Sequence, residues 1–395
     1  MKKEWKDRNV LYVKGDKRFL SHEGEIYGYE NDFLISLKDR YLYLGANVKF
    51  LQFWIILDEL DMSKLISLTE NGVEVIPVKY YLTPQTFKNK KVTKKNIFEA
   101  VLKCDILILR MPSLLSYIAQ EAAIKYGKPY IIELIGCPLE TLWTYSAKTK
   151  LLAPYSFFKC KKFVEKAEYV IYVSSEFLQK RYPNSKKTCS ISNVIIQTVS
   201  EDIIQKRINR FSKEKDKITI STMAAVDVLY KGQHFVIEAI AKLKNKGYTF
   251  EYHIAGQGNQ DRLIRIAEHF GIADQVIFEG TLGTEQVYEL LDNTDIYIQP
   301  SLTEGLPRAV VEAMSRGCVC VGSNIGSIQE LLDEICLFKS GNVNQIIRIL
   351  EKFVKDKNLL IQQSKINFTK AKNFHKELID KKRIKFYDEF ISDNF

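Results

Sequence analysis

Short apolar runs alternate with helix-length segments along almost the whole chain, and this alternation constrains the fold more than any other feature. Several of the runs, such as residues 106–109 and 169–173, are apolar or aromatic at every position rather than at every second one. Strands of this kind are typical of parallel sheets that helices cover on both faces. The pattern therefore predicts an α/β protein built on parallel sheets.

The alternation falls into two arrays, and 395 residues are enough for two domains. Strands are predicted in the first array at residues 10–13, 48–57, 73–78, 106–109, 130–134 and 169–173, and helices at 31–44 and 63–71. In the second array they are predicted at 218–222, 250–255, 276–279, 296–299 and 319–322. A polar, charged stretch separates the arrays. We predict a first domain over 1–200, a linker over 201–216, a second domain over 217–375 and a C-terminal helix over 376–395, for which packing back on the first domain is one option.

The net charge of +10 arises entirely in residues 1–200, which hold 31 Lys and Arg against 21 Asp and Glu. This asymmetry predicts an anionic partner for the first half, such as a membrane surface, a phosphorylated acceptor or nucleic acid. Residues 148–166 interleave six lysines with aromatic and leucine side chains, a pattern typical of helices that contact anionic lipids. An internal helix with a solvated lysine face is the alternative. No nucleic-acid-binding module is recognisable, so we expect no nucleic-acid partner.

Three observations bear on the compartment. No apolar run reaches the ~18 residues of a membrane span, and no apolar segment of the signal-peptide kind follows the charged N-terminus. The seven cysteines form no C-x-x-C pair and are expected to be reduced thiols. We therefore expect a cytoplasmic protein, with peripheral contact to the inner face of the plasma membrane as a further option.

The most informative motif follows the predicted strand 296–299 and reads PSLTEGLPRAVVEAMSRG. It places Glu304 in a loop before a helix that begins near Pro307, and Glu312 inside that helix. A helix N-terminus at the carboxyl end of a strand receives anions such as a diphosphate. Acidic side chains beside it accept hydrogen bonds from sugar hydroxyls without a metal.

Together with Lys231-Gly232, Gly256-Gln257-Gly258 and the phrase VIFEGTL, this motif resembles the family 4 (group 1) retaining glycosyltransferases. The resemblance implies the GT-B fold, in which two Rossmann-like domains face a central cleft. It also implies catalytic roles for Glu304, which faces the donor sugar, and Lys231, which binds its phosphates. Glu312 is expected to bind the ribose. The other expected donor-binding residues are Gly305, Leu306, Pro307, Arg308, Gly256, Gly258, Thr281 and, in the loop after the first strand, Gly28.

The sequence also departs from the family pattern. Ala224 and Ala225 stand where members commonly carry an arginine, and Arg262 and Arg308 are candidate replacements. Gly136 stands near the place of a common first-domain histidine, and Glu133 or Glu140 could supply the polar group instead. His22 is a further, less favoured acid–base candidate.

The resemblance implies a retaining enzyme that moves a hexose-type sugar from a nucleotide-diphosphate sugar to a glycan or lipid-linked acceptor, in cell-surface polysaccharide or glycolipid synthesis. No cofactor and no metal are expected. A non-catalytic GT-B partner subunit is the alternative, favoured by the missing arginine and histidine and opposed by Glu304, Glu312 and Lys231. A nucleotide-sugar epimerase would lack the EGLPRAVVEAM phrase. A Rossmann dehydrogenase is disfavoured because no G-x-G-x-x-G follows either first strand.

Overall fold

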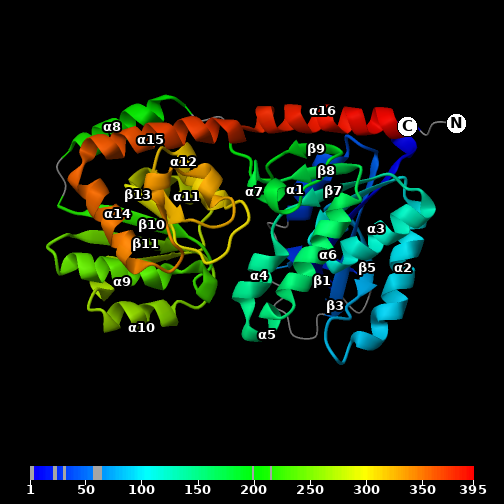
Figure 1. The fold of residues 1–395 in the computed structure, drawn as a ribbon, viewed down its shortest axis with the longest axis horizontal. Helices are drawn as coiled ribbons and strands as arrows, with labels where there is room; N and C mark the ends of the chain where they lie inside the picture. Colours follow the sequence, from blue (N-terminus) through cyan, green and yellow to red (C-terminus); the bar gives the residue numbers. More distant parts are fainter. Residues whose placement is uncertain (1–3, 21–24, 30–32, 57–64, 198–199, 214–215) are drawn as a thin grey trace.

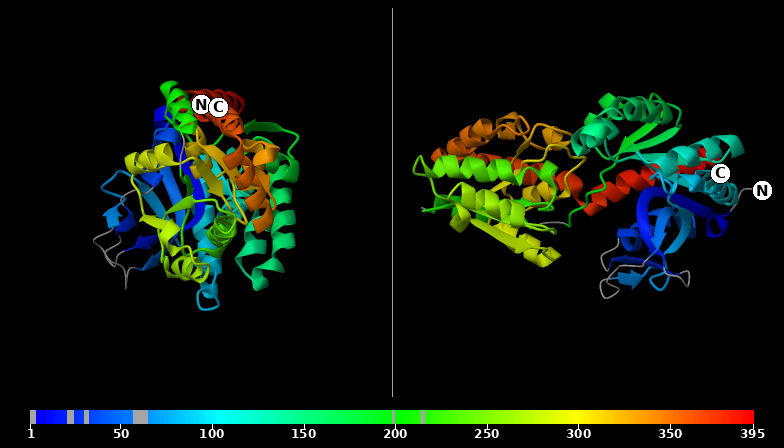
Figure 2. Two further views of the ribbon diagram at one scale, coloured as in Figure 1. Left: turned by 90° about the vertical axis from the view of Figure 1, so that its left-hand side faces the viewer. Right: turned by 90° about the horizontal axis from the view of Figure 1, so that it is seen from below.

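The computed structural model describes residues 4–20, 25–29, 33–56, 65–197, 200–213 and 216–395. Two sheets lie side by side, each with its own helices, and the long C-terminal helix spans from the second to the first (Figures 1 and 2). Each sheet is built mainly of parallel strands, so the predicted α/β class is confirmed.

Within the described residues the first sheet has nine strands. Seven of them run parallel in the order β5-β3-β1-β6-β7-β8-β9, and β2 and β4 form an antiparallel extension at the carboxyl end of β1. The strands are β1 Asn9–Leu20, β2 Ile26–Tyr29, β3 Asn47–Ile56, β4 Leu65–Ser67, β5 Glu74–Lys79, β6 Ile106–Met111, β7 Tyr130–Leu134, β8 Tyr169–Tyr172 and β9 Lys187–Ser190.

The continuous apolar runs of this sheet are buried on both faces, as their sequence predicts. Along β6, Leu107 and Leu109 join one core cluster, whereas Ile106 and Ile108 join another on the opposite face. The helices that precede the second sheet are α1 Phe33–Tyr41, α2 Lys90–Lys103, α3 Leu114–Tyr126, α4 Pro138–Tyr145, α5 Ala147–Lys150, α6 Ala153–Glu165 and α7 Phe177–Arg181. Helices α2, α3 and α6 cover the first face, and α1 covers the second together with α16 (Lys376–Asn394).

The second sheet is parallel throughout, in the order β12-β11-β10-β13-β14-β15. Its strands are β10 Ile218–Met223, β11 Phe250–Ala255, β12 Val276–Gly280, β13 Ile296–Gln299, β14 Val319–Ser323 and β15 Leu337–Phe338. Its helices are α8 Asp202–Ser212, α9 Gln233–Lys244, α10 Asp261–His269, α11 Thr284–Asn293, α12 Arg308–Ser315, α13 Ile328–Leu331, α14 Val343–Lys355 and α15 Lys357–Ala371. Because β10 is followed by β11 on one side and flanked by β13 on the other, the strand order reverses between β10 and β13. Ligands of open α/β sheets bind at such a switch point.

The predicted linker is wrong over most of its length, because residues 202–212 form helix α8. Ile203, Arg207 and Phe211 are buried at intervals of four residues along it. The Arg207 guanidinium caps the end of α11, donating hydrogen bonds to the carbonyl oxygens of Leu291 and Thr294, and also bonds that of Arg316 (2.7 Å). The buried face of α8 carries an arginine at position 207, where an amphipathic helix would normally have an apolar residue. The amphipathic pattern is therefore hard to recognise in the sequence.

The helix predicted at 63–71 is also wrong. Residues 65–67 form strand β4, which pairs antiparallel with β2, and 57–64 lie outside the described residues. Gly72, at φ 69°, closes a turn between β4 and β5, where the Val73 N–H donates to the Leu68 carbonyl oxygen (2.9 Å). Pairing with a strand distant in sequence, rather than local helix propensity, decides this segment.

The chain crosses between the sheets twice, and the two crossings lie side by side. The Ile196 N–H donates to the Phe374 carbonyl oxygen (3.0 Å), and the Lys376 N–H donates to that of Ile196 (3.1 Å). Helix α16 then returns to the first sheet (Figure 1). Its Phe386 and Phe390 side chains belong to the core of that sheet.

Candidate active site

The segments that leave β10 and β13 pack directly on each other at the switch point. Gly232 has φ 75°, and a Cβ built on it would lie 2.1 Å from the Pro300 carbonyl oxygen. The Leu302 N–H donates to the Tyr230 carbonyl oxygen at 2.7 Å. This contact needs glycine at 232 and brings the side chains of Lys231 and Glu304 together.

Lys231 and Glu304 form an ion pair, with 2.7 Å between Nζ and Oε1, and their side chains are 20% and 12% exposed. The same carboxylate oxygen accepts hydrogen bonds from Ser301 Oγ (2.8 Å) and Gln299 Nε2 (3.1 Å). None of the described residues donates to the second oxygen, Oε2. The carboxylate is thus held through one oxygen, Oε1.

Two buried side chains of β13 support this arrangement. The Tyr297 hydroxyl accepts from the Met223 N–H (3.3 Å) and donates to Gln299 Oε1 (2.7 Å), which orients the Gln299 amide toward Glu304. Burial raises the pKa of Tyr297 well above its usual range, and the carboxylates of Glu304 and Glu312 act in the same direction. Neither residue was predicted from the sequence as part of the site, although Tyr and Gln two positions apart in a buried strand share one face.

Glu312 lies on α12 and is paired with Arg308 one turn earlier, at 2.7 Å between Nε and Oε1. The Glu312 side chain is 14% exposed and that of Arg308 is 69% exposed. An ion pair with so exposed a partner contributes at most about 1 kcal/mol. A hydroxyl ligand of Glu312 would therefore meet little competition from Arg308.

Two glycines close the carboxyl end of β11 against the segment that follows β10. A Cβ on Gly256, at φ 153°, would lie 2.1 Å from the Ala224 carbonyl oxygen, and one on Gly258, at φ 115°, would lie 2.5 Å from Asp227. The Gly256 N–H donates to the Gly280 carbonyl oxygen (2.7 Å), next to exposed Thr281. The glycine turn and Thr281 thus lie at the same edge of the sheet.

The loop that carries Glu304 also touches the first domain. A Cβ on Gly305 would lie 2.9 Å from the Ile135 carbonyl oxygen, in the connection between β7 and α4. Leu306 packs against the cores of both sheets, and buried Pro307 precedes α12. The N–H groups of the first turn of α12, from Arg308 onward, have no partner within the helix.

Gly28 lies in β2, paired with Ile66 of β4, rather than in the predicted loop before a helix. The prediction fails because β1 extends to Leu20 and the chain then turns back as an antiparallel strand. His22 and residues 30–32 lie outside the described residues.

The proposed replacements for the family histidine differ in their surroundings. Glu133 is 3% exposed and accepts a hydrogen bond from the Tyr41 hydroxyl (2.8 Å), so it belongs to the core of the first domain. Glu140 lies at the start of α4 and pairs with Arg181 (2.9 Å). Burial raises the pKa of Glu140, and Arg181 partly opposes this shift.

Of the two candidate arginines, Arg308 holds Glu312, and Arg262 donates to the Val226 carbonyl oxygen (3.3 Å). Burial lowers the pKa of Arg262.

Among the described residues, no group of three His, Cys, Asp or Glu side chains is placed to hold a metal ion. None of the described helices is both long and apolar enough to cross a bilayer.

Comparison with known proteins gives the following matches. The profile of the family described as "Glycosyl transferases group 1" matches residues 204–370. The chain is 30% identical to protein CapJ of Staphylococcus aureus over 379 residues, covering 88% of this chain and 93% of CapJ. It is 30% identical over 159 residues, 38% of each chain, to WcaL of Escherichia coli, described as a putative colanic acid biosynthesis glycosyltransferase. The structure of Anabaena HepE in complex with UDP-glucose superposes with a TM-score of 0.66 at 16% identity, covering 96% of this chain and 99% of HepE.

Proposed function

The chain belongs to the group 1 glycosyltransferases and has their GT-B fold, and from this premise we propose that it is a retaining hexosyltransferase that uses a nucleotide-diphosphate sugar without a metal or other cofactor. The observation that carries the proposal is the convergence of Lys231, Glu304 and the start of α12 at the switch point of the second sheet. A cation and unpaired N–H groups suit a diphosphate, and the carboxylates suit sugar hydroxyls.

In this proposal the diphosphate lies between Lys231 and the first turn of α12. Lys231 would exchange its contact with Glu304 for the phosphate oxygens and stabilise the negative charge that develops on the leaving diphosphate. Glu304, held by Gln299 and Ser301, would remain in place and bind a hydroxyl of the transferred sugar through Oε2. Glu312 would bind the ribose, and Gly256, Gly258 and Thr281 would line the nucleoside end.

We further propose that the acceptor is a glycan or a lipid-linked glycan of a cell-surface polysaccharide or glycolipid. The likeness to WcaL, described as a putative glycosyltransferase of colanic acid synthesis, supports a polysaccharide product. The concentration of positive charge in residues 1–200 supports an anionic acceptor, such as a lipid phosphate, on the first-domain side.

The surface formed by α4, α5 and α6 supports a further part of the proposal, that the protein binds peripherally to the cytoplasmic face of an anionic membrane. We call the exposed apolar residues of this surface, together with its exposed lysines, the α4–α6 patch. The exposed fractions of its apolar members are Trp143 53%, Tyr145 74%, Leu151 85%, Leu152 57%, Tyr155 65% and Phe158 66%. Lys148, Lys150 and Lys162 are exposed beside them, and Tyr155, Phe158 and Lys162 share one face of α6. Exposed aromatic side chains beside lysines suit the interface of an anionic bilayer.

A non-catalytic partner subunit is the second candidate. Ala224 and Ala225 stand where the family commonly carries an arginine, and the Ala224 carbonyl oxygen lies against Gly256. A site with one cation fewer would bind the diphosphate but stabilise its departure less.

The test is a screen of nucleotide sugars, including UDP-glucose and GDP-mannose, for thermal stabilisation and for hydrolysis of the donor. A ligand at one hundred times its Kd stabilises the native state by about 2.7 kcal/mol, which a melting curve resolves. The proposal expects stabilisation by one donor and slow release of its sugar. Stabilisation without any turnover, also with an acceptor extract, would favour the partner subunit. No stabilisation by any donor would contradict both.

A further inference from the structure

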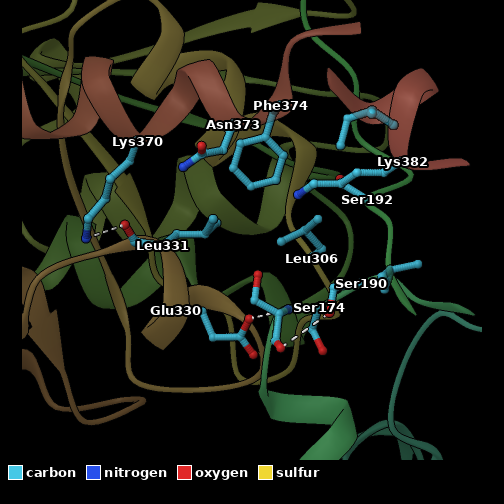
Figure 3. A pocket seen from close by; sticks show the side chains of 13 residues that line it. Ser174, Ser190, Ser192, Leu306, Glu330, Leu331, Lys370, Asn373, Phe374 and Lys382 are labelled. Carbon is cyan, nitrogen blue, oxygen red and sulfur yellow. Dashed lines mark hydrogen bonds between the residues drawn. The ribbon is translucent and has the colours of Figure 1, made fainter. Parts of the chain in front are cut away.

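The two domains are joined by a carboxylate of the second domain that accepts two backbone hydrogen bonds from the first. Glu330 of α13 accepts from the Ser175 N–H (2.7 Å) through Oε2 and from the Phe177 N–H through Oε1. It lines a cavity of about 260 Å³ where the domains meet, and Figure 3 shows its side chain beside Ser174. Both oxygens of one carboxylate are thus used across the interface.

Helix α7, which begins at Phe177, has a hydrogen bond of its own that serves the same end of the helix. Ser174 Oγ accepts from the Leu178 N–H at 2.9 Å. Local folding of α7 therefore has support from within the first domain. Glu330 is therefore not the sole cap of α7, and its contact serves to connect the two domains.

The segment that leads to Glu330 is packed on the backbone of the Glu304 loop. Gly326 has φ 48°, and a Cβ built on it would lie 2.1 Å from the Glu304 carbonyl oxygen. The Ser327 N–H donates to the Gly305 carbonyl oxygen at 3.1 Å. Three residues further on, Glu330 reaches the first domain, and Leu306 lines the same cavity (Figure 3).

We propose that Glu330 is a positioning residue: its two hydrogen bonds to the first domain hold the 326–330 segment, and through it the loop that presents Glu304 to the donor sugar. The proposal rests on the proposed function for the role of Glu304. Loss of the Glu330 contact would leave Glu312 and the start of α12 unchanged, because neither touches the 326–330 segment through a hydrogen bond. Lys231 would lose only its contact with Glu304, which it also gives up when it binds the diphosphate in the proposed function. The defect should therefore fall on sugar transfer and spare binding of the nucleoside diphosphate.

The experiment compares Glu330→Ala and Glu330→Gln with two controls. Ser174→Ala removes the cap of α7 within the first domain, and Glu334→Gln changes an exposed acid four residues from Glu330. Each protein is assayed for kcat and KM with the nucleotide sugar that the wild type uses and for UDP or GDP affinity by calorimetry. Hydrogen exchange is measured in two segments: the hydrogen-bonded amides of Leu302 and Ser327 at the Glu304 loop, and the amides in 175–177.

For Glu330→Ala we expect a fall in kcat of tenfold or more, diphosphate affinity within twofold of wild type, and faster exchange in both segments. Glu330→Gln keeps one acceptor oxygen and should lie between. Ser174→Ala should speed exchange near α7 only, and Glu334→Gln should change nothing. Unchanged exchange of the Leu302 and Ser327 amides, or equal losses of kcat and diphosphate affinity, would overturn the proposal. A wild type that transfers no sugar would overturn the proposed function instead, while the exchange data would still decide whether Glu330 holds the loop.

Discussion

The Lys231 ammonium lies 2.7 Å from Oε1 of Glu304, although the two residues are 73 positions apart. In the proposed function Lys231 binds the diphosphate and Glu304 binds the sugar, so the ion pair marks the place where these two parts of the donor meet. Because Glu304 is also held by Gln299 and Ser301, a diphosphate that attracts Lys231 would leave the carboxylate fixed. Without a donor, the ion pair thus holds the Lys231 ammonium at the site and leaves neither of the two largely buried charges unpaired.

The first prediction concerns Lys231. Replacement by Met should weaken binding of the bare nucleoside diphosphate about tenfold to a hundredfold, since a hydrogen bond to a charged group contributes roughly 1.5–3 kcal/mol. Calorimetry with the diphosphate measures it. Lys246→Met, which removes a lysine paired with Glu351 on the surface, is the control for net charge. Equal affinity in wild type and Lys231→Met would exclude the assigned phosphate contact.

The second prediction concerns the packing of the two loops. Gly232→Ala should destabilise the protein by more than the ~1–3 kcal/mol of a strained backbone, because its Cβ would also overlap the Pro300 carbonyl oxygen. Gly271→Ala is the matched control: φ is 68° there, and the added Cβ meets nothing within 4 Å. Urea unfolding of both variants isolates the overlap. Equal losses of stability would mean that the close contact between the loops contributes little.

The third prediction concerns the membrane. Replacing Lys148, Lys150 and Lys162 by Gln should weaken binding to anionic vesicles, most at low salt, because each lysine near such a surface contributes about 1 kcal/mol. The triple variant of Lys88, Lys90 and Lys91, exposed lysines outside the α4–α6 patch, removes the same charge. Co-sedimentation with vesicles measures binding. If both triple variants lose binding equally, or if neutral vesicles bind the wild type as well as anionic ones, the patch has no specific role.

The fourth prediction concerns metal. Transfer should persist in EDTA, because the proposed site neutralises the diphosphate with Lys231 and helix N–H groups. The assay is transfer at saturating donor before and after chelation. Complete loss in EDTA that added Mg²⁺ or Mn²⁺ restores would show that a cation supplies this charge instead.

Strands whose apolar residues are continuous were predictable with their observed bounds, as 130–134 and 296–299 illustrate, because burial on both faces leaves a local signal. Strand β4 was not, since its pairing with β2 depends on residues distant in sequence. Helix α8 was hidden by Arg207, a charged residue that is buried only because carbonyl oxygens of the second domain surround it.

For the site, the resemblance to the family located Lys231, Glu304 and Glu312, and the fold brings Lys231 and Glu304 into contact. Gln299 and Ser301, which donate hydrogen bonds to Glu304, could not be assigned from the sequence, because these contacts depend on how the loop folds back on β13. Gly28 was assigned to a loop by its place in the chain alone, and its pairing with Ile66 shows that it lies in a strand. Glu330 resembles any exposed helix acid in the sequence, and its role depends on where the second domain lies against the first.

The central claim assigns different roles to the two glutamates of the motif, and one pair of variants tests it. Glu304→Gln keeps the shape of the loop and removes the charge that pairs with Lys231, so diphosphate affinity should stay equal or rise while transfer collapses. Glu312→Ala should weaken the bare diphosphate about tenfold to a hundredfold through the lost ribose contact.

The deciding measurement is calorimetry of the bare nucleoside diphosphate beside a transfer assay with its sugar, for both variants and the wild type. The account predicts that only Glu312→Ala loses diphosphate affinity and that Glu304→Gln loses transfer alone. Equal loss of diphosphate affinity in both variants, or full transfer by Glu304→Gln, would contradict it.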